Sequence, residues 1–125
     1  MFIFTKLSSE DGRATGRLSL NGKTFAAVSG GYGKGELPEG TYHVDVRGAV
    51  EGSHLGSAFK AGGVGFFIPI AHVTEIGRRG LGIHPDGNVP GTEGCIGIQG
   101  NDAKRFLDTW KGLALSRRPT TLTVE

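Results

Sequence analysis

The chain has few of the features by which composition identifies a protein class. It has one cysteine among its 125 residues, so no internal disulfide can form. Its 14 basic and 12 acidic residues leave a net charge of +2, a balance that gives no indication of nucleic acid or a membrane surface as a partner. No apolar run approaches the ~20 residues of a membrane span. The first residues have neither the basic start nor the apolar core of a signal peptide, so we expect a protein made in the cytoplasm without one.

Glycine, in contrast, is abundant, at 23 residues. The glycines have no fixed period, which excludes collagen, and they separate short apolar runs. This pattern predicts many turns and short strands. The length fits one domain over residues 1–125.

Hairpins are predicted in the first half. Residues 1–7 favour a first strand. Asn21 and Gly22 separate two short runs and predict a type I′ hairpin, because both residues accept the positive φ that this turn needs. Over residues 41–48 apolar and polar side chains alternate, with Tyr42 on the apolar side, which predicts a half-buried strand.

The second half predicts a buried strand, a helix and a last strand. The apolar run 64–70 favours a central strand whose pairing Pro69 should end. Asn101 is the expected N-cap of a helix. Its apolar face is predicted to pack on a sheet, with Trp110 in the core, and it consists of Ala103, Phe106, Leu107, Trp110 and Leu113. The β-branched end, 120–125, favours a strand.

The single cysteine, Cys95, lies at the end of a glycine-rich loop, 11 positions after His84. Flanking glycines give clearance for a substrate, and backbone N–H groups there can face a developing negative charge. A nucleophilic cysteine must ionise, and a histidine within hydrogen-bond reach can accept its proton. His84 follows a predicted strand end and is the candidate base, whereas a small buried hydrophobe is the simpler alternative for Cys95. The other histidines are weaker candidates, and none has a zinc-ligand spacing with the cysteine: His43, His54 and His72.

The segment "IHPDGNVPGTEGCIGI" resembles the active-site segment of L,D-transpeptidases, in which a histidine and a variable loop precede Ser/Thr-x-Gly-Cys and an apolar residue. The matching residues are His84, Thr92, Gly94, Cys95 and Ile96. Upstream, "LPEGTYHV" is similar to the Pro-x-Gly-x-Tyr/Phe segment of that family. The segment from Thr15 to Val44 is similar to the small L,D-transpeptidase and carboxypeptidase effectors of bacterial type VI secretion, so the resemblance covers roughly Thr15 to Ile98.

The resemblance implies a mainly β domain, a mixed β sandwich with one packed helix near the C-terminus. It implies acyl transfer on peptidoglycan tetrapeptide stems, with Cys95 attacking the bond between diaminopimelate and D-alanine. His84 would act as the base, and backbone N–H groups around Gly94 would hold the oxyanion. The expected substrate-binding residues are Arg78, Arg79, Thr92 and Tyr42. No metal or cofactor is expected.

Two positions depart from the family pattern. Glu93 stands where a second histidine is usual, and Gly97 stands where an arginine or asparagine is usual. A carboxylate close to the sulfur would raise the thiol pKa. Arg78 and Arg79 could supply the missing basic group, although a solvated surface pair is the alternative.

The sequence is also compatible with other functions. The same cysteine and histidine would serve a peptidoglycan amidase or endopeptidase. A wall-binding or phage-tail module without catalysis is a further alternative. The resemblance also implies secretion into the periplasm of a target cell, with an immunity protein and a secretion-system component as partners.

Overall fold

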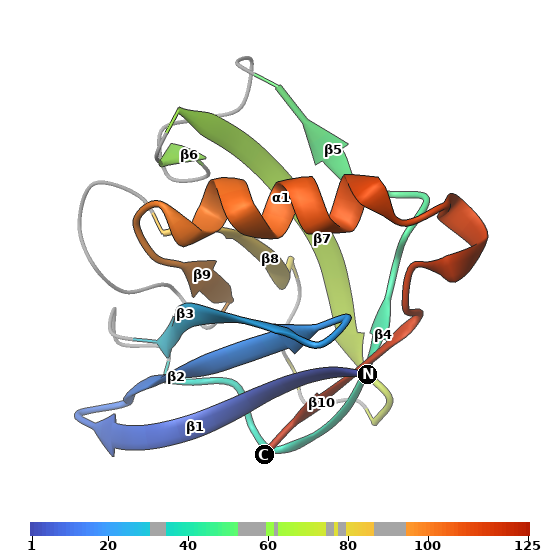
Figure 1. The fold of residues 1–125 in the computed structure, drawn as a ribbon. Coiled ribbons are helices and arrows are strands. Elements are labelled where there is room, and N and C mark those ends of the chain that lie inside the picture. Colours follow the sequence, from blue (N-terminus) through green and yellow to red (C-terminus); the bar gives the residue numbers. More distant parts are fainter. Residues whose placement is uncertain (31–34, 53–59, 62, 75–76, 78–79, 87–94) are drawn as a thin grey trace.

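The chain is mainly β, with one α-helix near its C-terminus (Figure 1). The computed structural model describes residues 1–30, 35–52, 60–61, 63–74, 77, 80–86 and 95–125. Its strands are β1 (Phe2–Glu10), β2 (Arg13–Leu20), β3 (Lys23–Gly30), β4 (Gly40–Val44), β5 (Val50–Glu51), β6 (Lys60–Ala61), β7 (Val64–His72), β8 (Gly82–Pro85), β9 (Ile96–Ile98) and β10 (Thr121–Val124). Its helices are α1 (Asp102–Gly112) and the 3₁₀ turn η2 (Leu115–Arg117).

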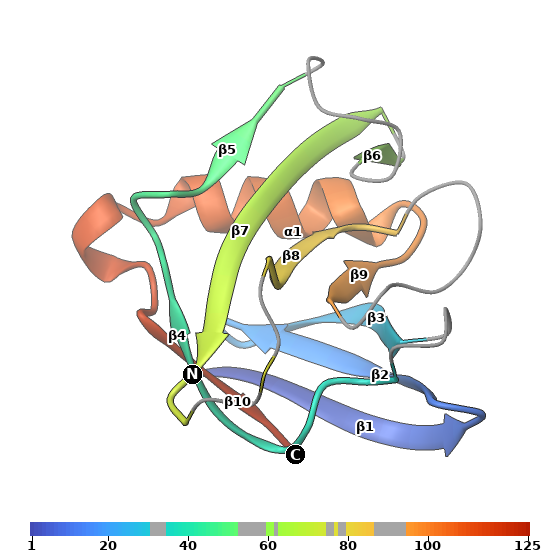
Figure 2. The same ribbon diagram turned by 180° about the vertical axis from the view of Figure 1, so that it is seen from behind.

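Eight of the strands close into a barrel. Their order is β4-β10-β1-β2-β3-β9-β8-β7, and β7 pairs back onto β4 (Figures 1 and 2). The β1–β10 and β8–β9 pairs are parallel and the others are antiparallel. The expectation of a mainly β chain with a C-terminal helix is confirmed, but the strands form a closed ring in place of the expected sandwich. Closure leaves no free edge in the ring.

Two tight turns build the β1–β2–β3 meander. Asn21 and Gly22 have φ of 51° and 79° and join Leu20 to Lys23, so the predicted hairpin is confirmed. Asp11 and Gly12, with φ of 52° and 74°, make the equivalent turn between β1 and β2. The Asp-Gly pair is as strong a turn signal as Asn-Gly, and it extends β1 beyond the predicted 1–7.

Pro69 does not end the pairing of its strand, contrary to the prediction. β7 continues to His72, with Pro69 opposite Gly82 and its carbonyl accepting a hydrogen bond of 2.9 Å from the backbone N–H of Asp45. That carbonyl faces the side of β4, which has already ended at Val44. The missing N–H of Pro69 therefore falls where no ladder bond is needed.

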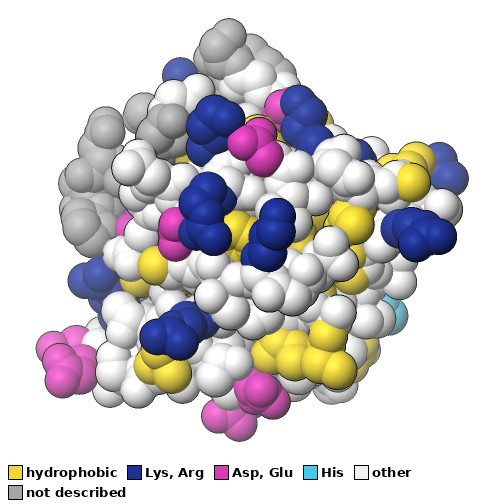
Figure 3. Space-filling model, in the orientation of Figure 1, with side chains coloured by type: hydrophobic (Ala, Val, Ile, Leu, Met, Phe, Trp, Pro, Cys, Tyr) yellow, Lys and Arg dark blue, Asp and Glu magenta, His cyan; other side chains and the backbone are white. Residues whose placement is uncertain are grey.

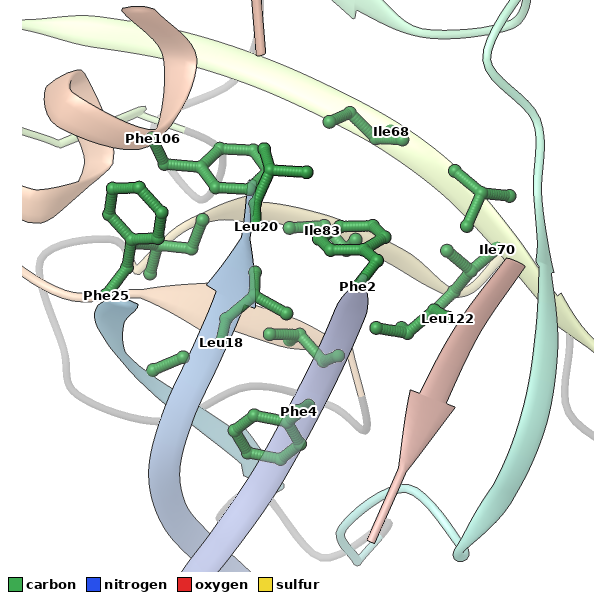
Figure 4. Close-up of a cluster of buried hydrophobic side chains, with 14 of the residues drawn as sticks. Phe2, Phe4, Leu18, Leu20, Phe25, Ile68, Ile70, Ile83, Phe106 and Leu122 are labelled. Carbon is green, nitrogen blue, oxygen red and sulfur yellow. The ribbon is translucent and has the colours of Figure 1, made fainter. Parts of the chain in front are cut away.

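Helix α1 lies across the barrel and inserts its apolar face into the core (Figures 1 and 4). Ala103, Phe106, Leu107 and Trp110 are buried and Leu113 is partly buried, as predicted. The ring of Phe106 contacts the rings of Phe25, Phe66, Phe2 and Trp110 at centroid distances of 5.4, 5.6, 6.2 and 6.2 Å. The opposite face is charged, as the dark blue and magenta side chains over the helix in Figure 3 show, and its exposed members include Lys104, Arg105, Asp108 and Lys111.

Asn101 is the N-cap of α1, as predicted, and Asp102 in the first turn attaches the helix to the barrel. The side chain of Asn101 makes no capping hydrogen bond. Asp102 accepts hydrogen bonds from the backbone N–H of Ala26 in β3 at 2.8 Å and from Arg105 at 2.6 Å. The bond from Ala26 is the main cause that lowers the pKa of the Asp102 carboxyl, with a smaller contribution from Arg105. This contact ties α1 to the barrel wall.

Truncating the ring at the centre of the core should be costly. We expect Phe106→Ala to lower the free energy of unfolding by about 3–5 kcal/mol, because the remaining aromatic rings cannot fill the cavity. Urea unfolding would measure the loss. Lys104→Ala, on the exposed face of the same helix, should change the free energy by less than about 1 kcal/mol. Equal effects of the two substitutions would contradict the described packing of α1.

Candidate functional site

His84 lies in β8, and Cys95 immediately precedes β9, the parallel neighbour of β8. In the β8–β9 pair, Ile83 lies opposite Ile96 and His84 lies opposite Gly97. Cys95 comes one residue before β9, so the same register places it beside Gly82. The two residues are therefore offset by two positions on adjacent strands.

The register also decides which face each side chain occupies. Ile83 and Ile96 are fully buried and point into the barrel. Side chains alternate along strands, so His84, Gly97 and Cys95 come on the outer face. Neighbouring strands lie about 4.8 Å apart and rise about 3.3 Å per residue, which separates the Cα atoms of His84 and Cys95 by about 8 Å. Side chains at this spacing can reach one another.

The ring of His84 is held in a defined tautomer by its own strand. Only 6% of His84 is exposed, and its Nδ1 lies 2.7 Å from the carbonyl oxygen of Pro85. A carbonyl accepts hydrogen bonds and cannot donate, so Nδ1 carries the proton in this bond. Nε2 of the neutral ring is then the nitrogen that can accept a proton.

Burial lowers the pKa of His84 below its ordinary value of 6.5. The hydrogen bond to Pro85 acts in the opposite direction, since it favours the protonated ring, but its effect is smaller. The imidazole is therefore neutral at neutral pH. A neutral ring with an unprotonated nitrogen is the form that a general base needs.

Cys95 is half-buried and packs against the edge of the core. Its thiol is directed at the carbonyl oxygen of Gly80, with the sulfur 3.7 Å from that oxygen. Gly80 precedes β8, whereas His84 lies near the end of that strand. The thiol therefore points away from His84, and proton transfer requires it to rotate toward the imidazole. Catalytic hydrogen bonds are often poorly aligned before the substrate binds, so this orientation is compatible with a dyad.

Glycines surround the two side chains on the outer face. Gly82 is beside Cys95, and Gly97 is beside His84. Continuing the β3–β9 register places Gly30 on the other side of Cys95. Neither neighbouring strand therefore brings a side chain of its own next to the thiol at this level. The space over Gly82 is, however, occupied by the ring of Phe67. The clearance for a substrate stays a prediction, because Gly91 and Gly94 lie outside the described residues.

Most of the other predicted site residues lie outside the described part of the chain. These are Arg78, Arg79, Thr92 and Gly94, together with Glu93 and His54. Their predicted roles stay predictions.

Tyr42 lies in the core, fully buried in β4, and does not belong to the candidate site. Its hydroxyl donates a 2.6 Å hydrogen bond to the carbonyl of Pro38, and its ring meets the ring of His72 edge to face at 4.8 Å. The substrate-binding role expected for Tyr42 is therefore replaced by a packing role. His43 is exposed on the same strand, and His72 is hydrogen-bonded to the backbone of Thr74.

Three features of the site were not expected from the sequence. The carbonyl of Pro85 orients the His84 ring, and a backbone group gives no sequence signal. Asp86 is buried, at 6% exposed, two residues after His84 on the same face, and the period of two along a strand could have indicated it. The ring of Phe67 in β7 lies nearly parallel to that of His84, at 11° and a centroid distance of 6.1 Å.

The described residues contain no group of three or more histidine, cysteine, aspartate or glutamate side chains that could hold a metal ion. Neither helix in the described ranges has the length and apolar character needed to cross a membrane.

Comparison with protein-family models, with curated proteins and with solved structures found no match to this chain.

The buried, neutral His84 should make stability depend on pH. In the unfolded chain His84 binds a proton below about pH 6.5, whereas the folded protein resists it because its pKa is lower. The unfolded state then holds more protons, so stability should fall as the pH is lowered from 6.5, by up to about 1.4 kcal/mol per pH unit. Urea unfolding at pH 7.5, 6.5 and 5.5 would measure this.

The control is a pair of substitutions. His84→Gln should remove this part of the pH dependence, whereas His43→Gln, on the exposed side of β4, should retain it. If the wild type and His84→Gln lost stability in parallel on acidification, the buried neutral state of His84 would be wrong.

Proposed function

We propose that this chain is a cysteine acyltransferase that acts on peptidoglycan tetrapeptide stems. The proposal rests on one observation above all. Cys95 and His84 lie diagonally on adjacent parallel strands, and the bond from His84 Nδ1 to Pro85 leaves Nε2 as the acceptor nitrogen. A nucleophile beside a base that a third group orients is typical of covalent catalysis. The substrate class comes from the resemblance of residues 83–98 to L,D-transpeptidases.

The first half-reaction forms a thioester. The thiol proton of Cys95 passes to Nε2 of His84, and the sulfur attacks the carbonyl carbon of diaminopimelate. The C–N bond to D-alanine breaks, and the protonated His84 returns its proton to the leaving amine. Donors around Gly94 would stabilise the oxyanion of the tetrahedral intermediate, and losing one such donor typically costs about 10²–10³-fold in rate.

The second half-reaction resolves the thioester. Water gives a shortened stem and makes the protein an L,D-carboxypeptidase. The amine of a D-amino acid or of a second stem gives exchange or cross-linking. In each case His84 takes a proton from the acceptor and gives it to the leaving Cys95 sulfur.

The proposed setting follows from the same resemblance. The small type VI effectors that this sequence resembles act in the periplasm of a target cell. An immunity protein in the producing cell and a secretion-system component are the partners that this setting requires.

Digestion of purified sacculi, with mass analysis of the muropeptides, tests the reaction. We expect the wild type to remove or exchange terminal D-alanine and Cys95→Ala to be inactive, because the variant lacks the nucleophile. Products cut at another wall bond would replace the proposal with the amidase or endopeptidase alternative. Unchanged muropeptides from both proteins would favour the non-catalytic wall-binding or phage-tail module.

Stability measurements make the result of Cys95→Ala interpretable. Cys95 is half-buried, so its removal should change the free energy of unfolding by no more than about 1–2 kcal/mol. His84→Ala should slow both turnover and alkylation of Cys95 near pH 7, since the thiol loses its proton acceptor. Full activity of either variant would exclude the dyad.

A guanidinium pair upstream of β8 is proposed to bind the stem carboxylates. Replacing Arg78 or Arg79 by alanine should reduce kcat/KM on a tetrapeptide by about 10–100-fold if that arginine holds a carboxylate. The loss should shrink on the amidated peptide, and alkylation of Cys95 by a neutral reagent should not change. Arg117→Ala, in η2, is the matched control. Wild-type kinetics for both Arg78→Ala and Arg79→Ala on both peptides would make the pair a solvated surface feature.

A further inference from the structure

Phe67 projects outward from a strand whose flanking residues point inward. Phe66 and Ile68 are each 1% exposed and belong to the core, whereas Phe67 is half-buried on the outer face. In the β7–β8 pair Ile68 lies opposite Ile83 and Pro69 opposite Gly82, so the same register brings Phe67 beside His84. The two rings lie within 11° of parallel.

The same ring fills the space above Gly82. A Cβ atom built on Gly82 would lie 2.3 Å from Cζ of Phe67 and 2.6 and 2.7 Å from its two Cε atoms. Such distances are far inside van der Waals contact, so any side chain at this position must displace the ring. Gly82 is the residue beside Cys95 in the β8–β9 register. The Phe67 ring therefore extends from the level of His84 to the level of the thiol.

We propose that Phe67 is a positioning residue for the His84–Cys95 dyad, and that Gly82 is glycine because the Phe67 ring occupies its side-chain space. The inference rests on the proposed function of the dyad. Phe67 has no group that can exchange a proton, so it acts through His84. Its ring limits rotation of the imidazole on one side, while the Pro85 carbonyl fixes Nδ1.

The ring also contributes to the burial that keeps His84 neutral. Among the described residues, four charged or titratable groups lie on the segments packed around His84. They are Asp86, which follows β8, Cys95, which precedes β9, His72 at the far end of β7, and Lys60 of β6, whose side chain lies over Gly65. A smaller side chain at position 67 would admit water to the imidazole. Since hydration stabilises the protonated form, the titration midpoint of His84 should then rise toward 6.5.

The test compares Phe67→Leu, which removes the flat ring, with Phe67→Tyr, which retains it. Three quantities are measured: the NMR titration of the His84 imidazole, the pH profile of Cys95 alkylation by a neutral reagent, and kcat/KM on a tetrapeptide stem. Phe67→Leu should raise the His84 midpoint and reduce alkylation at pH 7 and kcat/KM by roughly 10-fold or more, because the base is misplaced. Phe67→Tyr should stay within about 2-fold of wild type.

Gly82→Ala approaches the same contact from the other side. Alone it should displace the Phe67 ring and reproduce the changes of Phe67→Leu. In the double variant the smaller leucine leaves room for the new methyl group, so the two effects should not add. Leu113→Ala, which removes a half-buried side chain at the end of α1, controls for general loss of stability and should leave the His84 titration unchanged.

Two results would overturn the inference. One is a His84 titration, alkylation rate and kcat/KM within 2-fold of wild type in Phe67→Leu, and the other is additive effects of Gly82→Ala and Phe67→Leu. The titration and alkylation do not need the substrate. If the wild type left muropeptides unchanged while Phe67→Leu still moved both, the proposed reaction would fail and the positioning role would stand.

Discussion

The parallel pairing of β8 with β9 is the constraint on which the candidate site depends. Ile83 and Ile96 face each other inside the barrel with no exposed surface, and this fixes His84 and Cys95 outside it. A slip of one residue in either strand would turn the isoleucine of that strand outward and its candidate site residue, His84 or Cys95, inward. Parallel neighbours need a connection that runs back along the pair, and here the strands span only Gly82–Pro85 and Ile96–Ile98. The parallel register therefore brings together a histidine and a cysteine that are 11 positions apart in the sequence.

Strand β7 links this site to the core. Its inward side chains include Phe66, whose ring packs at 5.6 Å on Phe106 of α1, and Ile68, which lies opposite Ile83 of β8. Its outward Phe67 lies beside His84. One strand thus contacts the helix on one face and the histidine on the other. Its backbone pairs with β5 at Phe66 and Phe67 on one edge, and with β8 from Ile68 onward on the other. The helix therefore supports the site from inside the barrel, since the packing of Phe66 on Phe106 fixes the position from which Phe67 reaches the imidazole.

Features that depend on residues close together in the sequence were predicted correctly. The Asn21-Gly22 pair predicted the β2–β3 hairpin, and the spacing of Phe106 and Trp110 predicted the buried face of α1. Closure of the barrel was not predictable, because it depends on the pairing of β4 with β10 and β7, which are both distant from it in the sequence. Tyr42 shows two signals in conflict: strand alternation placed it in the core, the family resemblance placed it at the substrate, and the structure follows the alternation. The run 64–70 is apolar on both faces of the strand, so its pattern could not predict that Phe67 points toward His84.

The electrostatics of the dyad indicate how the proposed reaction would begin. A preformed thiolate–imidazolium pair would place a positive charge on the His84 ring, which burial keeps neutral. The sulfur of Cys95 is directed at the carbonyl oxygen of Gly80, which stabilises a thiol proton and repels a thiolate. The burial of His84 and the Gly80 carbonyl therefore both favour a neutral imidazole and a neutral thiol before the substrate binds. Proton transfer is then best coupled to attack, when the developing charge moves from the sulfur to an oxyanion that backbone donors can stabilise. A general-base mechanism, in which His84 acts as the substrate carbonyl arrives, fits this site better than a resting ion pair.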